Sequence, residues 1–198
     1  MAFVYVVRCN FNEPAKEPAW NAWYSGPKIA QMLQKPHFRT CQRFKRSAGS
    51  GRDYLALWTL RSPEAFRTEQ YTADWGFFEW APHITDWSRD LFDGGNTPEA
   101  SFAVPPQGGL HIVSFDGMSG DEASGAHAAI AQCQPDMLWL PIAGLDRHTP
   151  MLGLRIASDL RATDGPPGGR AGLQESGLKS VQEAVYRPIS GFATADRP

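Results

Sequence analysis

Several features that mark common functional classes are scarce or missing in this chain of 198 residues. Its 3 cysteines are odd in number and form no Cys-x-x-Cys pair, so neither a disulfide framework nor a cysteine zinc site is expected. No run of 18 apolar residues occurs, which excludes a membrane-spanning helix. The segment from Met1 to Cys9 lacks the basic and apolar regions of a signal peptide. We therefore expect a soluble, cytoplasmic protein.

An excess of positive charge is also missing. The 19 basic and 21 acidic side chains give a net charge of −2, which argues against a nucleic-acid binder. The sequence has no dinucleotide fingerprint, no phosphate loop and no Gly-x-Ser-x-Gly motif. His111, His127 and His148 do not have the spacing of metal ligands, so no metal site is predicted.

Aromatic residues are abundant and unevenly distributed. Residues 1–97 contain 18 of the 23 Phe, Trp and Tyr side chains, whereas 13 of the 19 glycines follow residue 97. Such different halves indicate different roles, and the aromatic half is the better candidate for a binding site.

Six elements are expected in residues 1–97. β-branched and aromatic runs bounded by turn residues predict strands. Apolar residues at helical spacing and a Ser-Pro start predict helices, with a kink at Gly26-Pro27. In order they are a strand at Phe3–Phe11, a helix carrying Trp20 to Leu33, strands at Phe38–Arg46 and Tyr54–Leu60, a helix from Ser62 through Tyr71 towards Trp80, and a strand at His83–Phe92. This β-α-β-β-α-β order is that of a ferredoxin-like unit.

The second half repeats this order more faintly after a linker at 98–109, which makes 110–198 a degenerate second ferredoxin-like unit. An antiparallel sheet with both helices on one face leaves its other face open, so two such sheets can cover each other. We predict an α+β fold of two βαββαβ units packed sheet to sheet as a pseudo-dimeric barrel, and such pseudo-dimers could pair again as homodimers. The expected elements are strands at Leu110–Phe115, Met137–Leu145, Met151–Ala157 and Val185–Ala193, helices at Ser124–Gln134 and Leu173–Ala184, and a loop at Ala162–Gly172.

Two stretches carry a family resemblance. The strand Leu55-Ala56-Leu57-Trp58-Thr59-Leu60 is followed by Ser62-Pro63-Glu64-Ala65-Phe66, and Trp20-x-x-Trp23-Tyr24 precedes Gly26-Pro27. The chain thereby resembles the dimeric α+β barrel superfamily, in particular its EthD-like and antibiotic-biosynthesis-monooxygenase-like branches. The resemblance implies a barrel fold and an activity among those of the superfamily, which include oxygenases, cyclases, isomerases, dehydratases and heme enzymes. EthD-like members often carry a His where Ser25-Gly26-Pro27-Lys28 stands here.

His83 is the leading catalytic candidate. It follows Pro82 where the second helix should meet the last strand, and an imidazole can act as acid or base near neutral pH. The resemblance supports it, because heme-degrading and cofactor-free oxygenases of the superfamily place a His near the end of this helix. Asp86 is a candidate orienting partner, and Tyr24 or Arg43 could stabilise a developing oxyanion.

The aromatic residues near His83 suggest a pocket for a flat hydrophobic substrate, although the same pattern is typical of an ordinary core. Arg8 and Asn10 share one face of the first strand, where they could contact substrate or lie at a wet strand end. The predicted substrate-binding residues are Trp23, Trp58, Tyr71, Trp75, Trp80, Trp87, Asn10 and Arg8.

These residues predict a small enzyme that uses acid–base chemistry on an aromatic or polycyclic metabolite without a cofactor. A lyase, an isomerase or cyclase, and a cofactor-independent oxygenase all fit. The alternatives are a heme-binding protein or heme-degrading monooxygenase with His83 as axial ligand, and a non-catalytic binding module whose aromatic face docks a partner.

Overall fold

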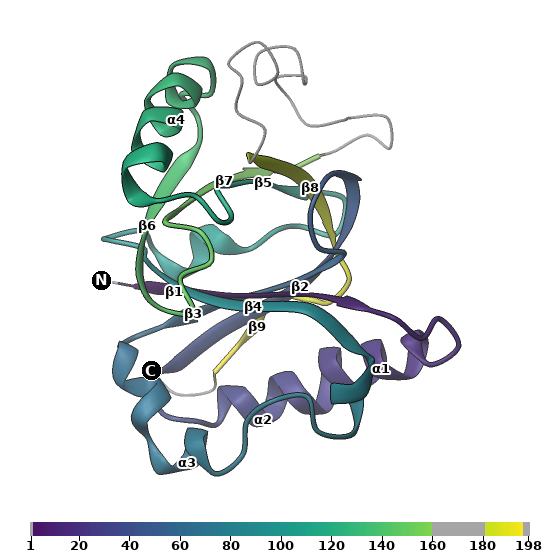
Figure 1. Cartoon of the computed structure of the whole chain (residues 1–198). Coiled ribbons are helices and arrows are strands. Elements are labelled where there is room, and N and C mark those ends of the chain that lie inside the picture. The colour runs from purple at the N-terminus through teal and green to yellow at the C-terminus, as the bar shows by residue number, and fades with distance from the viewer. Residues whose placement is uncertain (1, 160–180, 196–198) are drawn as a thin grey trace.

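Eight strands close into one antiparallel barrel in the computed structural model, which describes residues 2–159 and 181–195 (Figure 1). A short ninth strand extends the edge of one of them. The strands are β1 Phe3–Phe11, β2 Phe38–Gly49, β3 Tyr54–Leu60, β4 Ile84–Asp93, β5 Gly109–Ser114, β6 Leu138–Leu145, β7 Met151–Ala157, β8 Gln182–Pro188 and β9 Ala193–Thr194. The α+β class and the barrel are therefore confirmed.

Each half of the chain supplies four neighbouring strands. The first half runs β4-β1-β3-β2 and the second runs β6-β7-β5-β8, so the first and third strands of each half lie in the middle. Two antiparallel seams join the halves, β4 with β6 and β2 with β8. Most strand bounds agree with the sequence prediction, but the last strand begins at Gln182 rather than Val185.

Apolar side chains fill the barrel interior. Alternation along β1 sends Val4 and Val6 inward and Tyr5 and Val7 outward, because successive side chains of a strand point to opposite faces. The expected linker also contributes, since Phe102 and Val104 are buried in the interior cluster. Other members of this cluster are Phe44, Leu55, Leu57, Phe92, Leu110, Ile112, Leu140, Leu152, Leu154, Ala184 and Tyr186.

A buried charge network closes one end of this interior. Arg8 donates to Ser114 Oγ at 3.1 Å and to Asp116 Oδ1 at 3.0 Å, and its Nη2 lies 3.4 Å from Asp90 Oδ2. Arg52 donates to the second Asp116 oxygen at 2.6 Å. Burial raises the pKa of Asp116, but Arg8 and Arg52 outweigh it and leave that pKa below its usual value. Arg8 thus serves as the interior counter-ion of two carboxylates.

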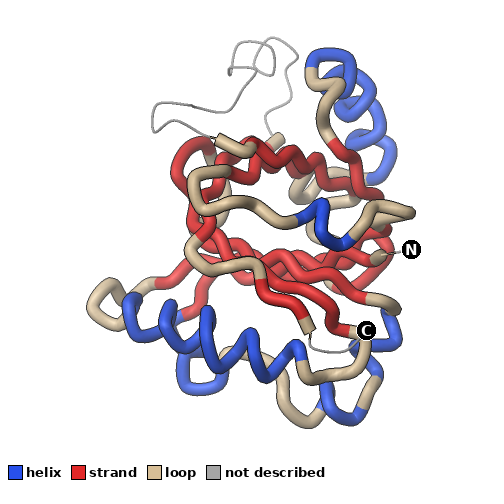
Figure 2. Tube along the Cα trace, turned by 180° about the vertical axis from the view of Figure 1, so that it is seen from behind, coloured by secondary structure: helices blue, strands red, loops and turns tan. Residues whose placement is uncertain are grey.

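One long helical segment crosses the outer face of the first-half strands, on the side opposite α4 (Figures 1 and 2). It consists of α1 Glu17–Trp23, a π-helical turn at Tyr24–Lys28 and α2 Ile29–Leu33. The π turn occupies the predicted Gly26-Pro27 kink. Four of its buried residues are spaced four positions apart, namely Trp20, Tyr24, Lys28 and Met32, and Ile29 is buried beside them.

The π turn keeps these four side chains on one face. In an α-helix a spacing of four overshoots one turn by about 40°, so four such residues would wind away from the sheet. A turn closed by i→i+5 hydrogen bonds contains more residues and reverses part of that drift. Tyr24 and Lys28 consequently face the same strands as Trp20.

The prediction of one continuous second helix in this half is wrong. The segment contains a 3₁₀ turn at Pro63–Arg67, α3 at Glu69–Thr72 and another 3₁₀ turn at Phe78–His83. Thr68 breaks it because its backbone is extended and its side chain caps the Tyr71 N–H at 3.3 Å. Gly76 breaks it again with φ of +105°.

In the second half, helix α4 spans Gly120–Cys133, so the predicted helix is present and starts earlier. Ser119 and Glu122 form a capping box at its start. A 3₁₀ turn at Glu99–Phe102 lies within the expected linker. The predicted loop Ala162–Gly172 and most of the predicted helix Leu173–Ala184 lie outside the described residues, and residues 182–184 belong to β8. In the part of the chain that the structure describes, no helix is long and apolar enough to cross a membrane.

Candidate functional site

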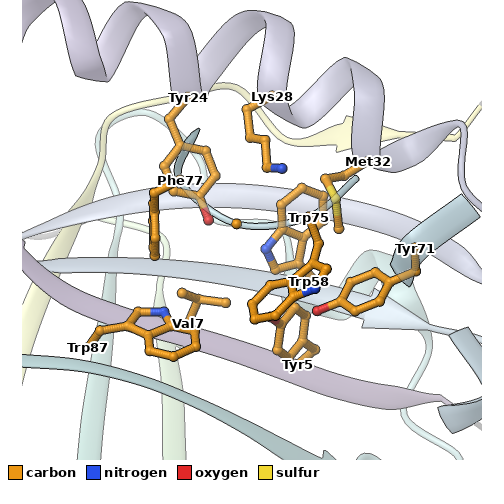
Figure 3. A pocket seen from close by; sticks show the side chains of 11 residues that line it. Tyr5, Val7, Tyr24, Lys28, Met32, Trp58, Tyr71, Trp75, Phe77 and Trp87 are labelled. Atoms are coloured by element: carbon orange, nitrogen blue, oxygen red, sulfur yellow. The ribbon is translucent and has the colours of Figure 1, made fainter. Parts of the chain in front are cut away.

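An aromatic cavity lies between the outer face of the first-half strands and the helical layer (Figure 3). Its free volume is about 30 Å³. A water molecule needs roughly 10–15 Å³ by this measure, so the closed cavity has room for one or two waters. Tyr5, Val7, Trp58 and Trp87 line it from the strands, and Tyr24, Lys28, Met32, Tyr71, Trp75, Gly76 and Phe77 line it from the helical side.

Lys28 brings an amine into this apolar space. Only 6% of the residue is exposed, and its Nζ points down from the π turn towards the cavity (Figure 3). Nζ lies 4.7 Å from the centre of the Phe78 ring and donates a long 3.5 Å hydrogen bond to Gln31 Oε1. Burial lowers the pKa of Lys28 to about 8, against the attraction of Asp74. A neutral amine available near neutral pH can act as a general base.

Tyr24 forms the wall beside Lys28, and Arg43 packs against the Tyr24 ring. The Arg43 guanidinium lies 4.2 Å from the Tyr24 ring centre and 4.7 Å from that of Trp20. It donates to Ser25 Oγ at 3.0 Å and to Asn21 Oδ1 at 2.9 Å. Burial lowers the pKa of Arg43 to about 10 and raises that of Tyr24. Arg43 therefore sits behind the cavity wall and holds the helix, whereas Tyr24 faces the cavity as a protonated hydroxyl.

Tyr71 forms a second polar point of the cavity. Arg89 Nη1 donates to its oxygen at 3.5 Å. Burial raises the pKa of both Tyr5 and Tyr71, so both hydroxyls keep their protons. Because the Tyr71 oxygen accepts from Arg89, its own proton is available to a ligand.

The cover of the cavity is a short segment that carries large exposed rings. Trp75 is 39% exposed and Phe78 is 48% exposed. Trp75 stacks on Tyr71 with ring centres 5.8 Å apart and on Trp87 at 6.2 Å. No ring-sized ligand fits this volume, and Trp75 is an exposed large hydrophobic side chain that lines it.

The backbone of the segment that carries Trp75 and Phe78 turns at Gly76. Its φ of +105° strains any residue with a Cβ, although a Cβ there meets nothing within 4 Å. Gly76→Ala should lower the free energy of unfolding by about 1–2 kcal/mol and make the indole of Trp75 easier to quench with acrylamide. Urea titration and quenching measure both effects. Gly125→Ala, in the exposed middle of α4, should instead stabilise the chain by about 0.5–1 kcal/mol.

His83 does not line the cavity. It ends a 3₁₀ turn, with its Nε2 2.9 Å from Lys16 Nζ and its ring 5.6 Å from that of Phe11. The Asp86 carboxylate, expected to orient it, instead pairs with Arg52 at 3.1 Å. The structure therefore brings neither His83 nor Asp86 to the aromatic space.

The other predicted residues divide into two groups. Tyr24, Trp58, Tyr71, Trp75 and Trp87 line the cavity. The second group lies elsewhere: Trp23 and Trp80 pack on each other beside Phe78 and Phe11, Asn10 accepts from the Asp53 backbone N–H, and Arg8 faces the barrel interior.

A heme at this cavity does not fit the residues present. No His lines it, and His83, the proposed axial ligand, lies beside a lysine outside it. Nor does any group of three or more potential metal ligands occur among the described residues.

Sequence reasoning missed Lys28, Tyr5 and Arg89. Lys28 carried a readable signal, because it continues the four-residue spacing of Trp20 and Tyr24. Arg89 had no comparable signal, because its role depends on contacts with Tyr71, 18 positions earlier, and with Asp146 in the second half of the chain.

Solved structures resemble this chain over almost its whole length. An anthrone oxidase-like protein, 13% identical, covers 99% of this chain and 94% of its own, with a TM-score of 0.60. The fold is an α+β barrel. A candidate monooxygenase from Fusobacterium nucleatum is 9% identical over 100% and 98% of the two chains, with a TM-score of 0.54. A dye-decolorizing protein from V. cholerae is 11% identical over 94% and 93%, with a TM-score of 0.51.

At these identities the likenesses show the fold alone. No protein-family model and no curated protein sequence matches the chain significantly. At such low identity the neighbours carry no residue roles over, so the activity has to be argued from the cavity itself.

Proposed function

We propose that the protein is a cofactor-independent oxygenase that acts on a flat aromatic substrate with an acidic C–H bond. The observation that carries this proposal is the buried amine of Lys28, whose pKa is about 8, in a cavity walled by aromatic rings. The oxygenase reaction is preferred to a lyase or isomerase reaction because two of the structural neighbours are named as oxidase-like or monooxygenase proteins.

The first step is a proton transfer to Lys28. The neutral amine takes a proton from a ring methylene of the substrate, and the electron pair of the broken C–H bond delocalises onto an oxygen of the substrate. The electron-rich carbanion then reacts with dioxygen. Overall a CH₂ group and O₂ give a C=O group and H₂O, so dioxygen takes the four electrons that the carbon loses.

The Tyr71 hydroxyl is placed to donate a hydrogen bond to the substrate oxygen on which negative charge develops. This hydroxyl donates while its oxygen accepts from Arg89, and positioned donors of this kind stabilise an anion strongly where water is excluded. Trp87 offers a further donor, since its Nε1 is buried and has no hydrogen-bond partner among the described residues. The aromatic walls then hold the ring system of the substrate.

The architecture is proposed to consist of two ferredoxin-like units fused in one chain. The same strand order in both halves, and seams that join the fourth strand of each to the second of the other, support this duplication. On this proposal residues 1–97 carry the site, and the second unit covers the inner face of its sheet.

The pH dependence tests the role of Lys28. The amine must be neutral to accept a proton, so kcat/KM for an anthrone should rise with pH and level off above about 8. An oxygen electrode measures the uptake, after subtraction of the spontaneous oxidation. A rate independent of pH between about 6 and 9 would contradict the assignment. Turnover of a substrate without oxygen uptake would instead indicate a lyase or isomerase.

A further inference from the structure

One turn from the second half of the chain contacts Arg89, whose guanidinium lies against two rings of the aromatic cavity, Trp75 and Trp87. The turn lies between β6 and β7, at residues 145–150. Asp146 Oδ1 accepts from Arg89 Nε and its Oδ2 from the Arg89 backbone N–H, both at 3.3 Å, while the Asp146 N–H donates to Arg89 O at 3.1 Å. Arg89 is thus held from its backbone to its guanidinium by a single residue.

Arg89 in turn organises the Tyr71 end of the cavity. Its guanidinium lies 4.6 Å from the Trp75 ring centre and 5.5 Å from that of Trp87, and Nη1 donates to the Tyr71 oxygen. The side chain is flexible, so without an anchor it would lose this geometry. Asp146 supplies that anchor and neutralises the charge.

The backbone of the turn is strained at this point. Leu145 and Arg147, the two neighbours of Asp146, have φ of +65° and +55°, which non-glycine residues rarely adopt. Strained residues persist only where surrounding contacts fix them, and they cluster at functional sites. The next residue, His148, donates its N–H to Asp90 Oδ1 at 2.8 Å, so the same turn also holds the interior network through the neighbour of Arg89 on β4.

We propose that Asp146 is a positioning residue that the second half contributes to the active site of the first. It acts through Arg89, which sets the orientation of the Tyr71 hydroxyl towards the substrate oxygen. The proposal rests on the oxygenase function proposed above. It also means that the site is incomplete without the second half, even though every cavity-lining residue belongs to residues 1–97.

A double-mutant cycle tests this pathway. Asp146→Ala should lower kcat for anthrone oxidation by about 10- to 100-fold with little change in KM, because the donor is misplaced while the aromatic walls remain. Arg89→Gln should lower kcat at least as much, and the double variant should be no slower than Arg89→Gln alone. Asp136→Ala, an exposed carboxylate of the same half, should match the wild type. If Asp146→Ala also matches the wild type, or if the two effects multiply, the proposal is overturned.

Tryptophan emission of the substrate-free protein gives a readout that does not depend on activity. Release of Arg89 from Trp75 and Trp87 should change the emission of Asp146→Ala, whereas Asp136→Ala should keep the wild-type spectrum. If the wild type consumes no oxygen with anthrones, the proposed function fails, and this spectrum alone decides whether Asp146 positions Arg89. An unchanged spectrum overturns the positioning role.

Discussion

Lys28→Met should reduce oxygen uptake by about 10²- to 10⁴-fold, the range that general-base catalysis contributes. Methionine has nearly the same length and keeps the cavity closed, but it cannot accept a proton. The residual rate should lose its dependence on pH near 8, because the titrating amine is gone. Steady-state kinetics at several pH values measure both effects. Full activity of Lys28→Met would show that the base lies elsewhere, with His83 the next residue to test.

The same substitution, Lys28→Met, should stabilise the fold. A loss of activity in this variant could then not be attributed to unfolding. The folded pKa of about 8 lies below the usual lysine value of 10.5, so the unfolded chain binds more protons between these values. The cost of burying the charge is therefore complete below about pH 8 and fades as pH rises towards 10.5. Lys28→Met should gain on the order of 1–3 kcal/mol near pH 7, less the lost contact with Phe78, and this gain should shrink above pH 8. Urea titrations at pH 7 and 10 measure the difference, and Lys16→Met at an exposed lysine is the matched control.

Arg8→Met should destabilise the barrel strongly, by about 3–5 kcal/mol. It leaves Asp90 and Asp116 in the interior without the cation they share, and it leaves Ser114 without its donor. Arg52 still reaches Asp116 but not Asp90, whose side chain is 0% exposed. The free energy of unfolding, measured by urea titration at pH 7, reports the loss.

A second variant keeps this result interpretable. Arg8→Met combined with Asp90→Asn removes one of the stranded charges and should recover part of the lost stability. Arg46→Met at the more exposed Arg46–Asp53 pair should cost at most about 1 kcal/mol. A cost for Arg8→Met as small as that for Arg46→Met would mean that the interior network contributes nothing beyond a surface ion pair.

The strands were predictable because their signals are local. Alternation of β-branched and aromatic residues located β1, β3 and β7 to the residue. The predicted helix after Ser62 failed because Thr68 and Gly76 act through backbone conformations that helical periodicity does not report. Cap residues are visible in the sequence, but whether Thr68 interrupts a helix or continues it depends on packing.

The sequence predicted most of the aromatic residues that line the cavity but not the lysine inside it. Five of the predicted aromatic residues line the cavity, because an aromatic-rich half must bury its rings somewhere and the sheet offers one outer face. His83 was favoured as the typical acid–base residue near neutral pH, yet its position beside Lys16 depends on where a 3₁₀ turn ends. Lys28 gains its chemistry from burial, and burial depends on the face of the helix rather than on residue type.

The π-helical turn at Tyr24–Lys28 has a consequence for how this protein could change during evolution. It holds one more residue than an α-helical turn would, and that single residue decides whether the amine faces the rings or the solvent. Loss of one codon between Trp23 and Lys28 would rotate Lys28 by about 100° relative to Trp20, away from the cavity. For this helix, a change in length therefore acts as a functional switch that conservative point mutations cannot imitate.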